Sequence, residues 1–109
     1  MSQKSLLQKT AIITGASSGL GFEISKAFLK AGSNLIICSR SEKDLSIALK
    51  KLSEFKEEKQ KIFSLPTDIS KETDIDSLIN ESNKKFKKIE ILVNNAGIIG
   101  PKGNFEELD

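Results

Sequence analysis

A glycine-rich turn between an apolar run and an amphipathic stretch is the feature that most constrains the fold of this chain. The run Thr10–Thr14 leads into the segment Gly15–Gly21, whose glycines stand at positions 15, 19 and 21, and apolar residues then recur at helical spacing. Such a turn gathers backbone N–H groups at a helix N-terminus, where the helix dipole favours an anion. The order of strand, turn and helix predicts a phosphate-binding loop. The alternative is a plain loop that needs glycine for its backbone angles.

The glycine spacing separates this turn from other nucleotide-binding loops. It is Gly-x-x-x-Gly-x-Gly rather than Gly-x-Gly-x-x-Gly, and no Gly-Lys-Ser/Thr follows. A P-loop needs that lysine and hydroxyl to hold a nucleoside triphosphate and its Mg²⁺. The spacing therefore argues against nucleoside-triphosphate hydrolysis.

Short apolar runs alternate with amphipathic stretches along the whole chain. The expected strands are Thr10–Thr14, Leu35–Cys38, Ile62–Leu65 and Ile89–Val93. The expected inward faces carry Leu20, Ile24, Ala27, Phe28 and Ala31 in the first helix, Leu45, Ala48, Leu49, Leu52 and Phe55 in the second, and Ile75, Leu78, Ile79 and Phe86 in the third.

Local signals mark where these helices begin and end. Ser41 and Ser70 are the expected N-caps of the second and third helices, and Gly32 is expected to stop the first. The segment Phe105–Leu108 resembles the first turn of another helix. Strands separated by helices pair in parallel through right-handed crossovers. The sequence therefore predicts an α/β fold: a Rossmann-type doubly wound parallel sheet, with four strands, three helices and the start of a fourth.

Composition limits the function. The chain has 109 residues, the size of one domain, and its net charge of +2 gives no electrostatic case for nucleic acid or a membrane surface. The single cysteine, Cys38, lies inside an apolar run, where it is expected to pack rather than react. The absence of histidine argues against a zinc site. No apolar run is long enough to cross a membrane, so a cytoplasmic protein is expected.

A second motif follows the fourth apolar run. Asn94-Asn95-Ala96-Gly97 stands directly after Val93. The motif Thr14-Gly15-x-x-x-Gly19-x-Gly21 stands before it in the chain. These two motifs, and the interval between them, resemble those of the short-chain dehydrogenases/reductases. The resemblance extends from Thr10 to the end of the sequence. It implies that residues 1–109 are an NAD(P)-binding Rossmann domain, the N-terminal, cofactor-binding half of such an enzyme.

The resemblance also implies which residues hold the dinucleotide. Those expected at its pyrophosphate and adenosine end are Gly15, Ser17, Ser18, Gly19, Leu20 and Gly21. Asp68 is expected to accept a hydrogen bond from the adenine amino group, with Ile69 against the ring; the alternative for Asp68 is a turn residue before Ser70. Asn94, Ala96 and Gly97 are expected to border the ribose and the nicotinamide.

The end of the second strand bears on the choice of cofactor. An acid there binds the ribose 2′-hydroxyl of NAD, whereas an arginine there pairs with the 2′-phosphate of NADP. Ser39 stands where the acid is expected, and Arg40 follows it. The basic residue that many NADP-dependent members carry at the position of Ser18 is missing. The sequence favours NADP(H) over NAD(H), with Arg40 as a solvated loop charge as the alternative, and the missing acid argues against an S-adenosylmethionine methyltransferase.

The resemblance implies an oxidoreductase that transfers hydride between NADP(H) and a carbonyl or alcohol substrate, and a homo-oligomer in the complete enzyme. The family's proton transfer uses a serine, a tyrosine and a lysine from the second half of the fold, and this chain contains no tyrosine. No residue is therefore assigned as catalytic and none as a metal ligand, and the isolated chain is expected to be inactive. The alternative function is a non-catalytic dinucleotide-binding or regulatory module.

Overall fold

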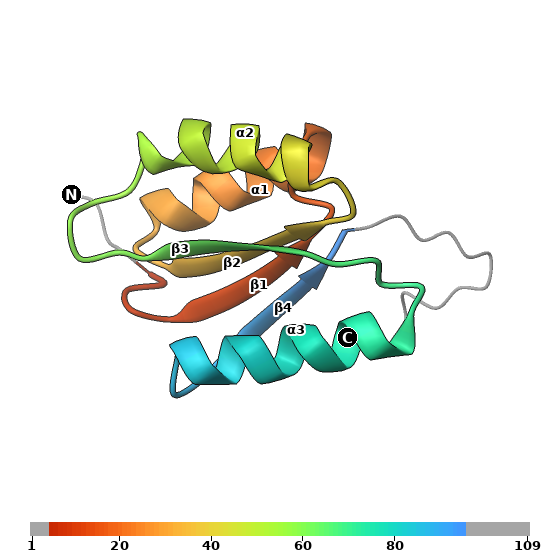
Figure 1. Ribbon diagram of the computed structural model, residues 1–109. Helices are drawn as coiled ribbons and strands as arrows, with labels where there is room; N and C mark the ends of the chain where they lie inside the picture. The colour runs from red at the N-terminus through yellow and green to blue at the C-terminus, as the bar shows by residue number, and fades with distance from the viewer. Residues whose placement is uncertain (1–4, 96–109) are drawn as a thin grey trace.

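A computed structural model of the protein describes residues 5–95. In this part of the chain, four parallel strands form one sheet in the order β3-β2-β1-β4. Figure 1 shows α1 and α2 on one face of the sheet and α3 on the other. The elements are β1 (Thr10–Thr14), α1 (Gly19–Lys30), β2 (Asn34–Ser39), α2 (Glu42–Ser53), β3 (Ile62–Pro66), α3 (Glu72–Lys85) and β4 (Ile91–Asn94). This arrangement confirms the predicted doubly wound α/β fold with four strands and three helices. The predicted start of a fourth helix, at Phe105–Leu108, lies outside the described residues.

The two central strands, β1 and β2, are apolar on both faces. All five residues of β1 are buried, as are the middle four of β2. Ile13 and Ile37 lie side by side in the core under α1 and α2, and Ile12 and Ile36 lie side by side in the core under α3. Because helices cover both faces, the inner residues of both strands have apolar surroundings on either side, which is typical of parallel sheets.

The fourth strand begins later than the sequence predicts. The apolar run 89–93 predicts a strand, whereas β4 spans Ile91–Asn94. Glu90 pairs with the start of β1 through its side chain: its Oε1 accepts the backbone N–H of Thr10 at 2.8 Å, while its own N–H donates to the Thr10 carbonyl at 3.0 Å. Because a carboxylate takes the Thr10 donor, the regular ladder starts with Ala11 opposite Ile91.

Three side chains predicted to face inward from helices are exposed instead. Leu20 is 66% exposed in the first turn of α1, Ile79 is 48% exposed on α3, and Ala27 is also exposed. The periodicity of a helix indicates its apolar face but not how far the neighbouring sheet extends beneath it. Leu20 lies in the first turn of α1, and Ile79 lines an apolar hollow with Leu92 of β4, the edge strand of the sheet.

The prediction that Phe55 faces the core from the second helix is also wrong. The helix α2 ends at Ser53, and Phe55 is 37% exposed in the segment that follows. Its ring contacts α1, with the ammonium groups of Lys26 and Lys30 at 5.2 Å and 5.5 Å from the ring centroid. Phe55 therefore packs against lysine side chains at the surface, in a cation–π arrangement.

Two of the three predicted helix boundaries are confirmed. Ser41 caps α2, with its Oγ accepting the backbone N–H of Asp44 at 3.1 Å. Gly32 follows α1 with φ +99°, a left-handed conformation that favours glycine.

The predicted cap of α3 by Ser70 is wrong. The helix begins at Glu72 with Lys71 as its N-cap residue, and no side chain caps it. Ser70 instead donates its N–H and its hydroxyl to Oδ1 of Asp68, at 3.0 Å and 2.6 Å. The turn before the helix thus uses the hydroxyl that a cap would need.

Candidate functional site

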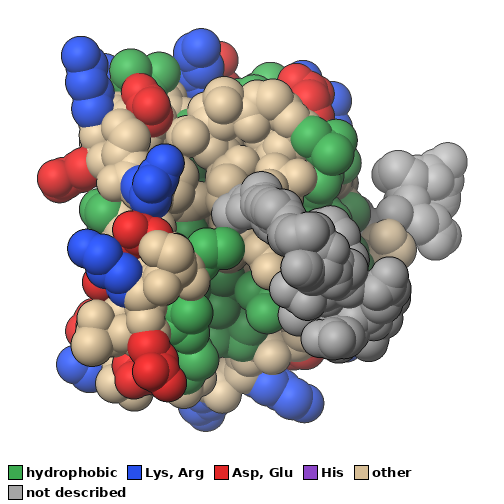
Figure 2. All heavy atoms as spheres, turned by 90° about the vertical axis from the view of Figure 1, so that its right-hand side faces the viewer, with side chains coloured by type: hydrophobic (Ala, Val, Ile, Leu, Met, Phe, Trp, Pro, Cys, Tyr) green, Lys and Arg blue, Asp and Glu red, His purple; other side chains and the backbone are tan. Residues whose placement is uncertain are grey.

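The carboxyl ends of β1, β2 and β3 surround a hollow of about 570 Å³. Figure 2 shows this end of the molecule, where acidic and basic side chains mingle along one side and hydrophobic side chains gather in the middle. In open parallel sheets, ligands bind outside the carboxyl ends of the strands. The hollow is lined by Gly15, Cys38, Ser39, Arg40, Ser41, Asp44, Thr67, Asp68, Ile69 and Ser70.

The glycine turn joins β1 to α1 as predicted, and its glycines serve two different purposes. Gly15 and Gly19 have φ of +62° and +59°, which side chains rarely tolerate. Gly21 is needed for close packing, because a Cβ there would overlap the carbonyl oxygen of Gly15 and lie 2.7 Å from Nδ2 of Asn95. A Cβ on Gly19 would meet nothing within 4 Å, so the start of α1 has open space above it.

The N-terminus of α1 differs from those of the other helices. Its N-cap residue, Ser18, makes no side-chain capping hydrogen bond, and the first turn contains no acid. The first turns of α2 and α3 each contain two acidic residues. Backbone N–H groups in a first turn lack intrahelical acceptors. At α1 neither a capping side chain nor a carboxylate compensates for them, so this end of the helix suits an anion.

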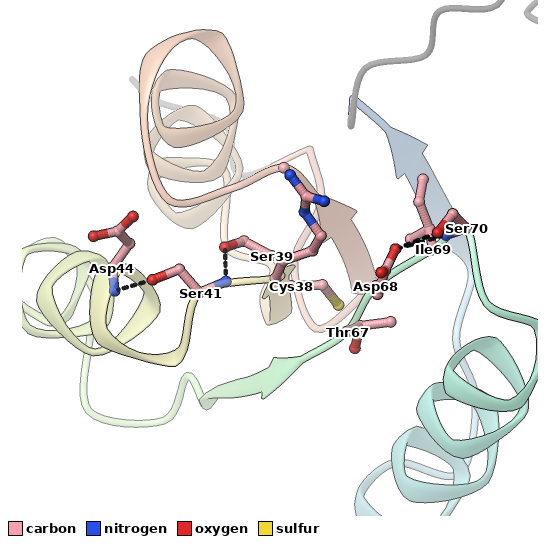
Figure 3. Close-up of a pocket in the computed structure, with 10 residues that line it drawn as sticks. Cys38, Ser39, Ser41, Asp44, Thr67, Asp68, Ile69 and Ser70 are labelled. Carbon is pink, nitrogen blue, oxygen red and sulfur yellow. Dashed lines mark hydrogen bonds between the residues drawn. The ribbon is translucent and has the colours of Figure 1, made fainter.

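Two serines lie at the end of β2, Ser39 as its last residue and Ser41 two residues later, and each accepts a hydrogen bond from the backbone. Ser39 Oγ accepts the N–H of Ser41 at 3.3 Å, and Ser41 Oγ accepts the N–H of Asp44 at 3.1 Å. Figure 3 shows these bonds in sequence along one side of the hollow. Because each hydroxyl uses a lone pair in this way, its own proton remains to donate to a ligand. Arg40, which stands between these two serines in the chain, is exposed and also lines the hollow.

Asp68 and Ile69 lie at the opposite end of the hollow, after β3 (Figure 3). The hydroxyl of Ser70 lowers the pKa of Asp68 most and the N–H of Ser70 next. Desolvation acts in the opposite direction, and the charges of Arg40 and Lys71 lower the pKa by smaller amounts. Asp68 is therefore an ionised turn residue, as the alternative interpretation expects. The bonds from Ser70 both use Oδ1, so Oδ2 faces no competition from them for a ligand.

Cys38 forms part of the wall of the hollow but is fully buried. Burial raises the pKa of its thiol to about 12, although a hydrogen bond with Thr67 acts in the opposite direction. The thiol therefore stays protonated at neutral pH, when only a thiolate is an effective nucleophile. Cys38 packs in the core, as the sequence predicts.

A hydrogen-bonded link that sequence reasoning missed joins the glycine turn to the end of β4. Thr14 Oγ1 donates to Oδ1 of Asn94 at 3.0 Å and accepts the N–H of Asn95 at 2.9 Å. Asn95 Nδ2 in turn donates to the carbonyl of Gly15 at 3.3 Å. The available signal was a threonine in a buried run, directly before a glycine. Together these bonds connect the two sequence motifs, which are 80 residues apart at Thr14 and Asn94.

The predicted site residues fall into four groups. The hollow described above brings together Gly15, Arg40, Asp68 and Ile69. Asn94 and Ile69 line a second, more apolar hollow of about 380 Å³, beside α3 and β4. Outside both linings, at or just before the start of α1, lie Ser17, Ser18, Gly19, Leu20 and Gly21. Ala96 and Gly97 lie outside the described residues.

The part of the chain at residues 5–95 also bears on metal sites and on membrane spans. That region contains no group of three or more histidine, cysteine, aspartate or glutamate side chains that could hold a metal ion. No helix in it is long and apolar enough to cross a membrane.

A glycine turn from β1 into α1, beside a polar hollow at the carboxyl ends of parallel strands, defines a Rossmann-type nucleotide-binding fold. The sequence profile of the short chain dehydrogenases matches residues 9–109, and the chain belongs to this family. A short chain dehydrogenase/reductase of Gibberella zeae, dpfgG, is 40% identical over 95 residues, which cover 87% of this chain and 34% of that protein. The chain thus spans about a third of the length of that curated relative.

Solved structures of family members share the fold. RhlG of Pseudomonas aeruginosa, in a complex with NADP, is 30% identical with a TM-score of 0.80, covering 98% of this chain and 42% of that one. A 3-ketoacyl-(acyl-carrier-protein) reductase of Brucella melitensis, in a complex with NADH, is 37% identical with a TM-score of 0.76, covering 86% and 36%. Because similar proteins hold either cofactor, the preference of this chain depends on its own site residues.

Proposed function

We propose that this chain forms the NADP(H)-binding part of an oxidoreductase that transfers hydride between NADP(H) and a carbonyl or alcohol substrate. Membership of the short-chain dehydrogenase family supports the reaction class. The observation that carries the cofactor choice is the end of β2, where Ser39 and Arg40 replace the expected carboxylate and line the hollow. When bound, NADP(H) supplies or accepts the hydride, and residues of this chain bind and orient the cofactor.

The pyrophosphate is assigned to the N-terminus of α1. The backbone N–H groups of Gly19, Leu20 and Gly21 belong to a first turn without acid or capping side chain. The open space at Gly19 allows an anion to approach them. Gly15, Ser17 and Ser18 complete this part of the site, the serines as hydroxyl donors. The donors and the helix dipole fit a phosphate without any further cation.

The adenosine 2′-phosphate is assigned to Arg40 with Ser39 and Ser41. A guanidinium forms strong, paired hydrogen bonds with a phosphate. The two hydroxyls already accept backbone N–H groups, and so they are arranged to donate. Donors suit a phosphate, whereas the 2′-hydroxyl of NAD is best held by a carboxylate acceptor. This arrangement of donors supports NADP(H) over NAD(H).

The remaining site residues are assigned to the adenine ring and to the nicotinamide half of the dinucleotide. Asp68 Oδ2 is proposed to accept the adenine amino group while Ile69 lies against the ring, because both line the same hollow as Arg40. Asn94, Ala96 and Gly97 are proposed to border the nicotinamide half. Asn94 is fixed for this purpose by its hydrogen bond with Thr14. Each of these groups binds or positions the cofactor, and none is proposed to move a proton.

The test is a titration of the 109-residue chain with NADPH and with NADH, followed by the cofactor's own fluorescence. The chain contains no tryptophan or tyrosine, so the protein contributes little background. NADPH should bind more tightly than NADH. Replacing Arg40→Gln should weaken NADPH binding by about ten- to a hundredfold, the value of a hydrogen-bonded charge pair, and leave NADH within about twofold.

The matched control is Lys43→Gln, which removes an exposed cation from the first turn of α2 that does not line the hollow. It should change neither affinity by more than about twofold, because exposed charges at a distance are screened. Equal affinity of the wild-type chain for the two cofactors, or tighter NADH binding, would contradict the proposed cofactor preference. If Arg40→Gln lost affinity for NADPH and for NADH by the same factor, the proposed role of Arg40 would be contradicted.

A further inference from the structure

The charges that line the hollow do not favour a phosphate as strongly as Arg40 alone would suggest. Among the residues lining it, all of which the structure describes, one guanidinium stands against two carboxylates, those of Asp44 and Asp68. A phosphate monoester brings a further charge of about −1.5 to −2 at neutral pH. The site therefore contains groups that oppose the 2′-phosphate as well as groups that hold it.

The two carboxylates differ in position. Asp68 lies at the β3 end of the hollow and accepts two hydrogen bonds from Ser70. Asp44 lies at the opposite end, in the first turn of α2, and its backbone N–H bonds to Ser41 (Figure 3). Of the two carboxylates that line the hollow, that of Asp44 thus belongs to the residue bonded to Ser41, on the side assigned to the 2′-phosphate.

The carboxylate of Asp44 is not used in helix capping. In a capping box, the third residue of the helix accepts the backbone N–H of the cap residue. Here the N–H of Ser41 donates to Ser39 Oγ at 3.3 Å instead. Within residues 5–95 the structure gives the Asp44 carboxylate no hydrogen bond. No cation within residues 5–95 forms an ion pair with it at the edge of the hollow.

We propose that Asp44 is a specificity-determining residue that opposes the 2′-phosphate and so limits the preference for NADP(H) over NAD(H). The inference rests on the proposed function, since it requires the 2′-phosphate to lie among Ser39, Arg40 and Ser41. Asp44 then repels a ligand that carries this phosphate and has little effect on one that lacks it.

The experiment compares two ligands that differ by the 2′-phosphate alone, adenosine 2′,5′-bisphosphate and adenosine 5′-monophosphate. Each is titrated into the full chain by calorimetry. Asp44→Asn should strengthen binding of the bisphosphate by about two- to fivefold, as expected for one exposed charge pair, and leave the monophosphate unchanged. The difference between wild type and variant should shrink at about 0.5 M salt, because the effect is electrostatic.

The matched control is Glu42→Gln, which removes the other acid from the first turn of α2 but does not line the hollow. It should have less than half the effect of Asp44→Asn on the bisphosphate. A second variant, Asp44→Ser, keeps a residue suited to a helix start and guards against an effect on folding, which circular dichroism will report. It should reproduce the selective gain.

The proposal for Asp44 is overturned if the Asp44 variants bind both ligands more tightly by the same factor or bind neither more tightly. It is also overturned if Glu42→Gln has the same effect as Asp44→Asn. Failure of the proposed function registers elsewhere: Arg40→Gln would then not selectively weaken binding of the bisphosphate. If Arg40→Gln selectively weakens the bisphosphate and the Asp44 variants change nothing, the proposed function stands and the role of Asp44 is rejected.

Discussion

Gly21 offers the sharpest test of how the glycine turn is built. Its backbone approaches the carbonyl of Gly15 so closely that a Cβ would overlap the oxygen, and the same Cβ would lie 2.7 Å from Nδ2 of Asn95. The Asn95 amide can rotate away, but the Gly15 carbonyl belongs to the backbone. Gly21→Ala must therefore move the turn away from α1.

The cost can be worked from these contacts. Overpacking typically costs about 1–3 kcal/mol, and a backbone obstacle favours the upper end. Displacing the turn also breaks the hydrogen bond between Asn95 and Gly15, worth about 1 kcal/mol. Alanine recovers about 1 kcal/mol through its helix preference. The free energy of unfolding should fall by about 3 kcal/mol, which for a domain of this size lowers the melting temperature by about 10–20 °C.

Gly19→Ala is the matched control. A Cβ there meets nothing within 4 Å, so the cost is only that of φ +59° for an alanine, about 1–2 kcal/mol. Thermal unfolding of both variants, followed by circular dichroism without cofactor, gives the comparison. The double variant Gly21→Ala with Asn95→Ala should recover less than half of the loss, because the Gly15 carbonyl remains. If Gly21→Ala melts at or above Gly19→Ala, the close-packing argument is refuted.

Two further predictions concern the hydrogen bonds that link β1 to residues 90–95, the last segment that the structure describes. Thr14→Val removes the hydrogen bonds to Asn94 and Asn95 and should lower the free energy of unfolding by about 1–3 kcal/mol in denaturant titrations, whereas Thr10→Val, on the same buried strand, should cost less. The N–H of Thr10 lowers the pKa of Glu90 more than desolvation raises it, so the ionised carboxylate stabilises the fold at neutral pH and loses this effect as the pH falls through the lowered pKa. The melting temperature of the wild type should therefore converge on that of Glu90→Gln as the pH falls through the lowered pKa, and a gap that stays constant with pH would contradict this.

The parts of the fold that were predictable from the sequence depend on short-range patterns. The inner residues of β1 (11–13) and of β2 (35–38) are apolar at every position, as a strand buried on both faces requires. The glycines of the turn could be placed because they fall between such a run and a helical period. Ser41 could be identified as a cap because Asp44 follows at the usual spacing.

The errors arise where another residue, near or distant in the sequence, competes for the group that a local pattern assigns. Ser70 has the right position for a cap, yet Asp68 takes its hydroxyl two residues earlier. Likewise, Glu90 lies within an apolar run, but its carboxylate replaces a strand partner for Thr10 across 80 residues. The presence of Asp44 in the hollow is of the same kind, since it depends on how α2 leaves the sheet. No local pattern contains this information.

The register of the sheet explains why cofactor preference can change without changing the fold. Parallel pairing places Thr14 beside Cys38 and Cys38 beside Leu65, and these positions lie at or near the last paired rungs of the three strands. Ser39 is the last residue of β2, and its carbonyl accepts the N–H of Thr67, which fixes the two sides of the hollow relative to each other. Arg40 and Asp44 come after this point and contribute nothing to the buried core. Charges in this segment can therefore vary at little cost in stability, as expected of a family in which proteins similar to this chain hold NADP in one case and NADH in another.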